Sequence, residues 1–61
     1  MKNHIQNQIN DLESIMETLA PDQIKEKIHY LRKLAKKHNL EEYFQDEFYG
    51  LEMNLWEIVK Q

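Results

Sequence analysis

Three stretches of the chain repeat the same apolar spacing, and this repetition constrains the fold more than any other feature of the sequence. Side chains that recur alternately four and three positions apart lie along one side of an α-helix, whereas a half-buried strand alternates every second residue. The sequence therefore predicts an all-α fold whose core comes from three such seams. Their members are Ile5, Ile9, Leu12, Met16 and Leu19; Ile24, Ile28, Leu31 and Ala35; and Phe44, Phe48, Leu51, Leu55 and Ile58.

The breaks between these stretches predict where each helix begins and ends. A residue before proline is disfavoured in a helix, so the first helix should end at Ala20, and Pro21 suits the first turn of the second. Asn39 is either a left-handed C-cap of the second helix or an N-cap of the third, with Glu42 completing a capping box. We expect a small antiparallel bundle of three helices at about residues 3–19, 21–38 and 40–60.

Gly50 falls in the middle of the third expected helix, where glycine costs about 1 kcal/mol relative to alanine. Two interpretations are open. Gly50 kinks the helix or admits a close neighbour, or it is a tolerated residue on a polar face.

The size of the chain limits how stable such a bundle can be. The 61 residues make at most one helical domain, 1–61. A domain of this length buries only about 60% of the surface of its unfolded chain, and small domains compensate with disulfides, a metal ion or self-association. The chain has no cysteine, which excludes disulfides. We therefore expect the bundle to be completed by coiled-coil-like association into a homodimer.

The distribution of apolar residues also bears on the compartment. No apolar run approaches the roughly 18 residues of a membrane-spanning helix, and the N-terminal segment 1–11 is too polar for a signal peptide. The absence of cysteine fits a reducing compartment. We expect a cytoplasmic protein without membrane contact.

Catalytic chemistry has few candidate residues in this sequence. The chain has no glycine-rich phosphate loop, and its single serine is Ser14. Its three histidines, His4, His29 and His38, are far apart and do not form the spacings of helical metal sites. We expect no enzyme, no catalytic residue, no cofactor and no metal.

A second apolar stripe on the third helix exceeds what one core needs. Taking Phe44 as the origin, Tyr49, Met53 and Trp56 lie at about 140°, 180° and 120° around the helix, roughly a third of a turn from the core seam. They belong to the core if the third helix is wedged between two neighbours. Otherwise they form an exposed patch for a partner or a dimer interface. We favour the patch, because tryptophan and tyrosine are typical interface anchors and methionine adapts to irregular surfaces.

Charge is unevenly distributed along the chain. Residues 21–38 carry six basic and two acidic residues, a net charge of +4, whereas residues 39–61 carry six acidic residues and one lysine, a net charge of −5. The acidic segment 39–61 either complements the basic second helix or mimics a nucleic acid and binds a basic site on a target.

The basic residues of the second helix share one side and could contact an anionic partner; they are Lys25, Arg32, Lys33 and Lys36. Basic helices bind phosphates. However, the helix that follows begins with four carboxylates between residues 41 and 47, which phosphates would repel. A solvated face, or pairing with the acidic third helix, is the better explanation of this stripe.

These observations together favour an interaction protein over an enzyme. We expect a small regulatory or inhibitory protein that acts through protein–protein contacts and associates with itself through its helices. The alternatives are an accessory nucleic-acid-binding protein that uses the basic face of the second helix, and a purely structural oligomerisation unit.

Overall fold

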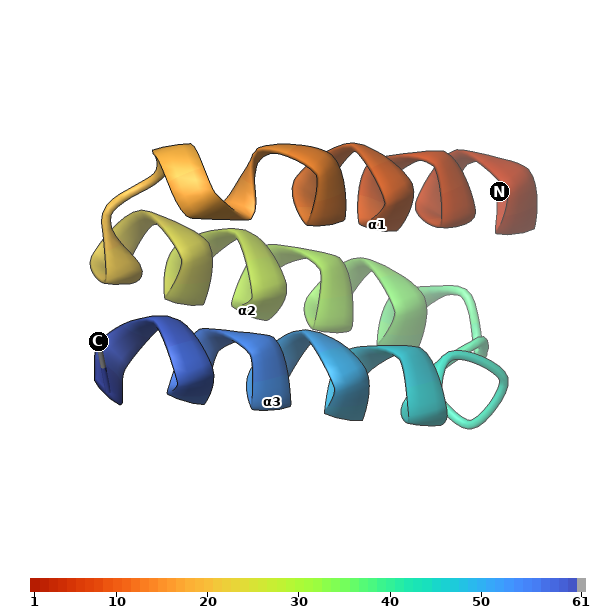
Figure 1. Cartoon of the computed structure of the whole chain (residues 1–61). Coiled ribbons are helices and arrows are strands. Elements are labelled where there is room, and N and C mark those ends of the chain that lie inside the picture. Colours follow the sequence, from red (N-terminus) through yellow and green to blue (C-terminus); the bar gives the residue numbers. More distant parts are fainter. Residues whose placement is uncertain (61) are drawn as a thin grey trace.

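The chain folds into three α-helices packed side by side, and the computed structural model describes residues 1–60 (Figure 1). Helix α1 spans Lys2–Ile15 and continues as the 3₁₀ turn η1 over Met16–Thr18, α2 spans Pro21–Lys37, and α3 spans Gln45–Lys60. Consecutive helices run in opposite directions, and α2 packs against both α1 and α3. The Cα atoms extend over 34 × 16 × 15 Å, so the long axis follows the helices. The predicted all-α arrangement of three helices is confirmed.

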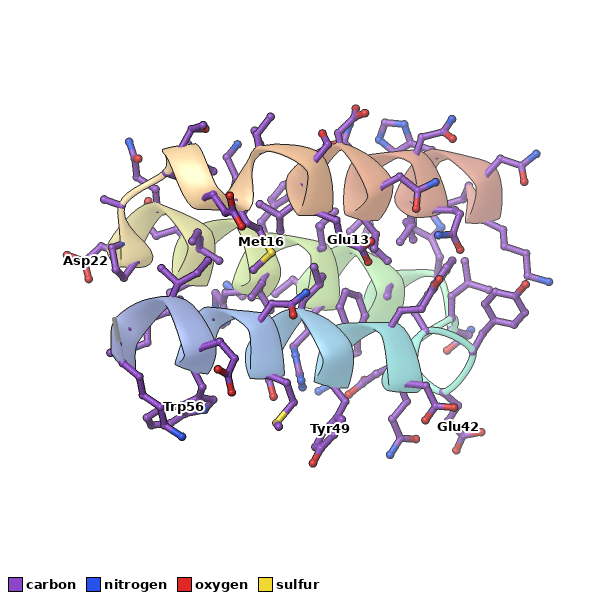
Figure 2. All side chains as sticks on the ribbon, viewed as in Figure 1. Glu13, Met16, Asp22, Glu42, Tyr49 and Trp56 are labelled. Atoms are coloured by element: carbon purple, nitrogen blue, oxygen red, sulfur yellow. The ribbon has the colours of Figure 1, made fainter. Side chains whose placement is uncertain are left out.

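The three apolar seams meet in one core, as their spacing predicts. Each helix turns its seam inward, and Figure 2 shows Met16 directed into the space between the helices. No polar or charged residue among residues 1–60 is buried, so the core is held by apolar contacts alone. Its members are Ile5, Ile9, Leu12, Met16, Ile24, Ile28, Leu31, Ala35, Phe44, Phe48, Leu51 and Leu55, with Leu19, Leu34, Leu40 and Ile58 packed at its edge.

The α-helical part of the first helix ends earlier than the expected range 3–19, and it continues as a tighter 3₁₀ turn. The α-helical pattern stops at Ile15, and the N–H of Leu19 donates to the carbonyl of Met16 at 3.2 Å. The Thr18 hydroxyl donates to the carbonyl of Ile15 at 2.7 Å. A 3₁₀ turn of this kind is common where a helix finishes, and it satisfies carbonyls that have no partner in an α-helix. Met16 nevertheless stays in the core.

The second helix begins at Pro21, as predicted. Ala20 is extended, with φ −68° and ψ 148°, which is the conformation that a residue before proline favours. The backbone N–H of Ala20 donates to Gln23 Oε1 at 3.1 Å, which is one half of a capping box. Alanine has no side-chain acceptor for the other half.

The end of α2 decides between the two interpretations of Asn39. This residue has φ 58°, in the left-handed region. Its N–H donates to the carbonyl of Lys36 at 3.1 Å, and the N–H of Leu40 donates to the carbonyl of Ala35 at 2.7 Å. These paired bonds form a Schellman motif, so Asn39 terminates α2 and is not the N-cap of α3.

The third helix begins at Gln45, so its expected start at residue 40 is wrong. Residues 41–44 form a turn in which the N–H of Phe44 donates to the carbonyl of Leu40 at 3.1 Å. Phe44 is fully buried, and the ring of Tyr43 meets it edge-on with centroids 4.8 Å apart. This turn places Phe44 in the core with the residues of the three helices. The seam predicted Phe44 to be core, although it precedes the helix.

Gly50 lies inside α3, and the helix continues through it to Lys60. A Cβ atom added to Gly50 would meet no atom within 4 Å. No neighbour therefore requires a glycine there, which contradicts a close neighbour and agrees with a tolerated residue.

Candidate interaction surface

The second apolar stripe of α3 is exposed. Tyr49 is 63% exposed, Met53 46% and Trp56 61%. Figure 2 shows Tyr49 and Trp56 projecting outward from α3, on the side away from α1. The alternative in which these three residues belong to the core of a single chain is therefore wrong. We call Tyr49, Met53 and Trp56 the outer stripe.

The periodicity of α3 explains why its two apolar sets separate so cleanly. Phe48 faces the core and is 1% exposed, while the next residue, Tyr49, is turned about 100° further around the helix. The outer stripe repeats at four and three positions, as the core seam does. Such spacing forms a second continuous seam, which is the pattern by which helices pair.

An open groove runs between α2 and α3 beside the outer stripe. Its volume is about 490 Å³. Ile28 and Leu55 are buried core residues at its base, whereas Trp56 and Val59 are exposed. The remaining lining residues are polar or charged and come mainly from α2: Lys25, His29, Arg32 and Glu52. The groove therefore joins an apolar wall on α3 to a basic wall on α2.

Arg32 and Glu52 form an ion pair across this groove. The guanidinium carbon of Arg32 also lies 5.5 Å from the centroid of the Phe48 ring, within cation–π range. Arg32 Nε is shielded from solvent without a hydrogen-bond partner, which lowers the net contribution of the pair to stability. This contact shows one basic residue of α2 pairing with acidic α3.

The four basic residues predicted for an anionic partner have different surroundings on α2. Arg32 is half-buried and paired with Glu52, whereas Lys25, Lys33 and Lys36 are exposed. Lys25 lines the groove, and Lys33 and Lys36 do not. The three free-standing lysines thus lie along one edge of α2 rather than converging on a point.

Sequence reasoning missed two parts of the exposed apolar surface. Val59 is 54% exposed and extends the outer stripe along the groove. Ile15 and Tyr30 are also exposed and line a smaller groove of about 360 Å³ between α1 and α2. Tyr30 could have been found by its angle, since it falls about 240° from Ile24 and so away from the core seam.

The described residues 1–60 contain no cluster of three or more side chains of the kinds that bind metal ions. Within the same part of the chain, every helix is too short or too polar to cross a membrane.

No protein-family model, curated protein or solved structure matches this chain.

Proposed function

We propose that this chain is a small non-enzymatic regulatory or inhibitory protein that acts by protein–protein contact through the outer stripe. One observation carries the proposal. Tyr49, Met53 and Trp56 are exposed together on one side of α3, although the chain has a complete apolar core without them. Folding does not explain three large apolar side chains on this face, whereas binding does.

The mechanism is steric. Trp56 and Tyr49 present large apolar rings with a polar edge, which suits a contact that is buried on one side and wet on the other. Met53 lies between them and can adjust its shape to the surface that it meets. The protein would occupy a surface on its target and block other ligands there. Charges around the stripe would set the encounter rate and the register more than the affinity.

Self-association uses the same surface in this proposal. A homodimer through α3 would cover the outer stripe and add apolar burial to a domain too small to bury much by itself. Target binding and dimerisation would then exclude each other, so the free monomer is the inhibitory form.

The nucleic-acid alternative rests on Lys25, Lys33 and Lys36, which are exposed on α2. Against it, Arg32 is paired with Glu52 and is less available for a phosphate. Salt separates the two functions, because phosphate binding weakens steeply as salt rises while binding through aromatic anchors does not. The Lys33→Glu/Lys36→Glu variant should abolish nucleic-acid binding and leave target binding intact.

The first test is molar mass by light scattering across a dilution series, with Trp56 fluorescence read on the same samples. Trp56 is the single tryptophan, so the emission reports its surroundings alone. We expect a dimer with blue-shifted emission at high concentration and a monomer with red-shifted emission on dilution. A monomer with red-shifted emission at every concentration would contradict self-association and leave a foreign protein as the partner.

Matched variants connect this result to the outer stripe. Tyr49→Ala and Trp56→Ala should weaken association, whereas Tyr30→Ala should not, although Tyr30 is 60% exposed and Tyr49 63%. Circular dichroism should show equal helix content in all of them. When the same variants are immobilised as bait, Tyr49→Ala and Trp56→Ala should lose a target protein, and Tyr30→Ala should retain it. Loss of binding in Tyr30→Ala alone would place the interaction surface between α1 and α2.

A further inference from the structure

The two flanks of the outer stripe carry opposite charge. On the side of α2, Lys25 and His29 line the groove with Trp56. On the other side, Asp46 and Glu57 are exposed and lie at about 200° and 220° around α3, beyond the stripe. The stripe is therefore an apolar seam with a basic edge and an acidic edge, and the exposed Lys60 lies at its C-terminal end, at about 160°.

This asymmetry discriminates between the two ways in which a two-fold axis can bring two copies of α3 together. If the axis is perpendicular to the helices, the copies run in opposite directions and equivalent edges meet, basic against basic and acidic against acidic. If the axis is parallel to the helices, the copies run in the same direction and each basic edge meets an acidic edge. Like charges across an interface disfavour a pairing, and opposite charges favour it.

We infer that the outer stripe is covered by a second copy of this chain, with the two α3 helices running in the same direction about a two-fold axis parallel to them. The inference rests on the proposed self-association and adds its geometry. In this arrangement each stripe residue meets its own equivalent, so Tyr49 lies opposite Tyr49 and Trp56 opposite Trp56. This pairing is that of a parallel coiled coil, whose spacing of four and three the stripe has.

The heights of the charges along the helices agree with this arrangement. The ion pair sets Arg32 level with Glu52, and α2 and α3 run in opposite directions at about 1.5 Å per residue. Lys25 is then level with residue 59, in agreement with the groove that it lines with Val59. Glu57 of the second copy comes within about 3 Å of that height.

The other end of the stripe gives the same match. By the same count Lys36 is level with residue 48, and Asp46 of the second copy is about 3 Å from that height. At both ends of the interface a lysine of α2 thus lies at nearly the same height as an acidic residue of the other α3. A dimer in the opposite direction would instead bring Lys25 of one copy near Lys36 of the other.

The size of the stripe predicts a weak dimer. A buried aromatic side chain covers about 150–250 Å², so the exposed parts of Tyr49 and Trp56 supply about 250 Å² from each copy. A specific interface buries at least about 1,000 Å² in total. Met53, Val59 and the charged edges must supply the rest, so the charges decide the direction of pairing.

Disulfide trapping tests the direction directly, because the chain has no cysteine of its own. Tyr49→Cys should cross-link to itself under mild oxidation, since equivalent residues meet when the helices run in the same direction. Met53→Cys, near the middle of the stripe, should cross-link in either direction. Tyr30→Cys is an equally exposed control that reports random collision.

The outcomes separate the inference from the proposed self-association. In one outcome, Tyr49→Cys forms no disulfide-linked dimer by itself but forms one when it is mixed with Trp56→Cys. That result would overturn the parallel direction and leave self-association intact. Failure of both Tyr49→Cys and Met53→Cys to exceed Tyr30→Cys, with a monomeric mass by light scattering, would overturn both.

Charge reversal gives a second test, because the same substitution should weaken a parallel dimer and strengthen an antiparallel one. Lys25→Glu should raise the dissociation constant about tenfold, because two attractive pairs per dimer become repulsive. Adding Glu57→Lys to the same chain should restore association. In a dimer of opposite direction Lys25→Glu would instead strengthen association, by pairing with Lys36, and that result would overturn the inference.

Discussion

The two apolar faces of α3 have similar residue spacing, but one face is buried and the other is exposed. Phe48 and Tyr49 are neighbours in the chain, yet Phe48 is 1% exposed and Tyr49 is 63% exposed. Hydrophobicity alone does not separate them. The packing of α3 does, because one face of the helix meets α2 in the core and the other does not. Burial in this bundle is decided by which face the neighbouring helices cover.

The residue types on the two faces differ in a way that matches this separation. The inner face uses phenylalanine and leucine, which have no polar atom in the side chain to satisfy. The outer stripe uses tyrosine, methionine and tryptophan, which combine large apolar area with a polar or polarisable group. The first set suits a permanent core, and the second suits a surface that is sometimes wet.

The largest test of this contrast substitutes the two neighbouring residues separately. Phe48→Ala should lower the free energy of unfolding by about 3–5 kcal/mol, because it leaves a cavity in the core. A domain of this size has little more than that in total, so the variant should be largely unfolded. Tyr49→Ala should change the stability of the monomer by no more than about 0.5 kcal/mol.

Urea denaturation followed by circular dichroism measures both variants, at a concentration low enough to keep the chain monomeric. Equal losses in Phe48→Ala and Tyr49→Ala would contradict the assignment of one inner and one outer face.

The turn that orients α3 provides the next test. Asn39 has φ 58°, and a residue with a Cβ but no local polar side chain is disfavoured there by about 1 kcal/mol. Asn39→Ala should lower the free energy of unfolding by about that amount, whereas Asn39→Gly should leave it unchanged or raise it. If both variants were equally destabilised, the asparagine side chain rather than the left-handed backbone would be the important feature.

Gly50 tests a position that belongs to neither apolar face. Gly50→Ala should raise the free energy of unfolding by up to about 1 kcal/mol, because alanine favours the helix and the added Cβ meets no atom. Thermal or urea unfolding of the monomer measures the gain. A loss of stability would show that something approaches Gly50 closely.

The smallest effect is expected at the ion pair between α2 and α3. The side chains of Arg32 and Glu52 are 40% and 43% exposed, so solvent screens the pair. A double-mutant cycle of Arg32→Ala and Glu52→Ala should give a coupling energy of about 0.5 kcal/mol, and less at high salt. A coupling above 2 kcal/mol would mean that this pair, rather than the apolar seams, holds α3 in place.

Apolar periodicity predicted most of the core, but it did not predict the ends of the helices. All of the seam residues are buried except Leu19 and Ile58, which lie at the core's edge. The start of α3 was missed because Phe44 keeps the spacing of the seam while its backbone belongs to a turn. Spacing reports the direction of a side chain around an axis and does not report where regular hydrogen bonding begins.

The outer stripe was also visible in the sequence, from its angle to the core seam. Its exposure was not, because a helix between two neighbours would bury the same residues. The charged face of α2 showed a similar limit. Its spacing put Lys25 and Arg32 on one side, but only the packing of α3 shows that Arg32 meets Glu52.

The separation of the two faces of α3 has a consequence for how such a protein can evolve. Tyr49, Met53 and Trp56 are outside the core, so exchanging them does not disturb the residues that fold the chain. Selection can change the choice of partner at these positions while the fold stays the same. Only the few positions that the helical repeat brings to that face can be substituted in this way. A new binding specificity must therefore arise from changes at very few sites.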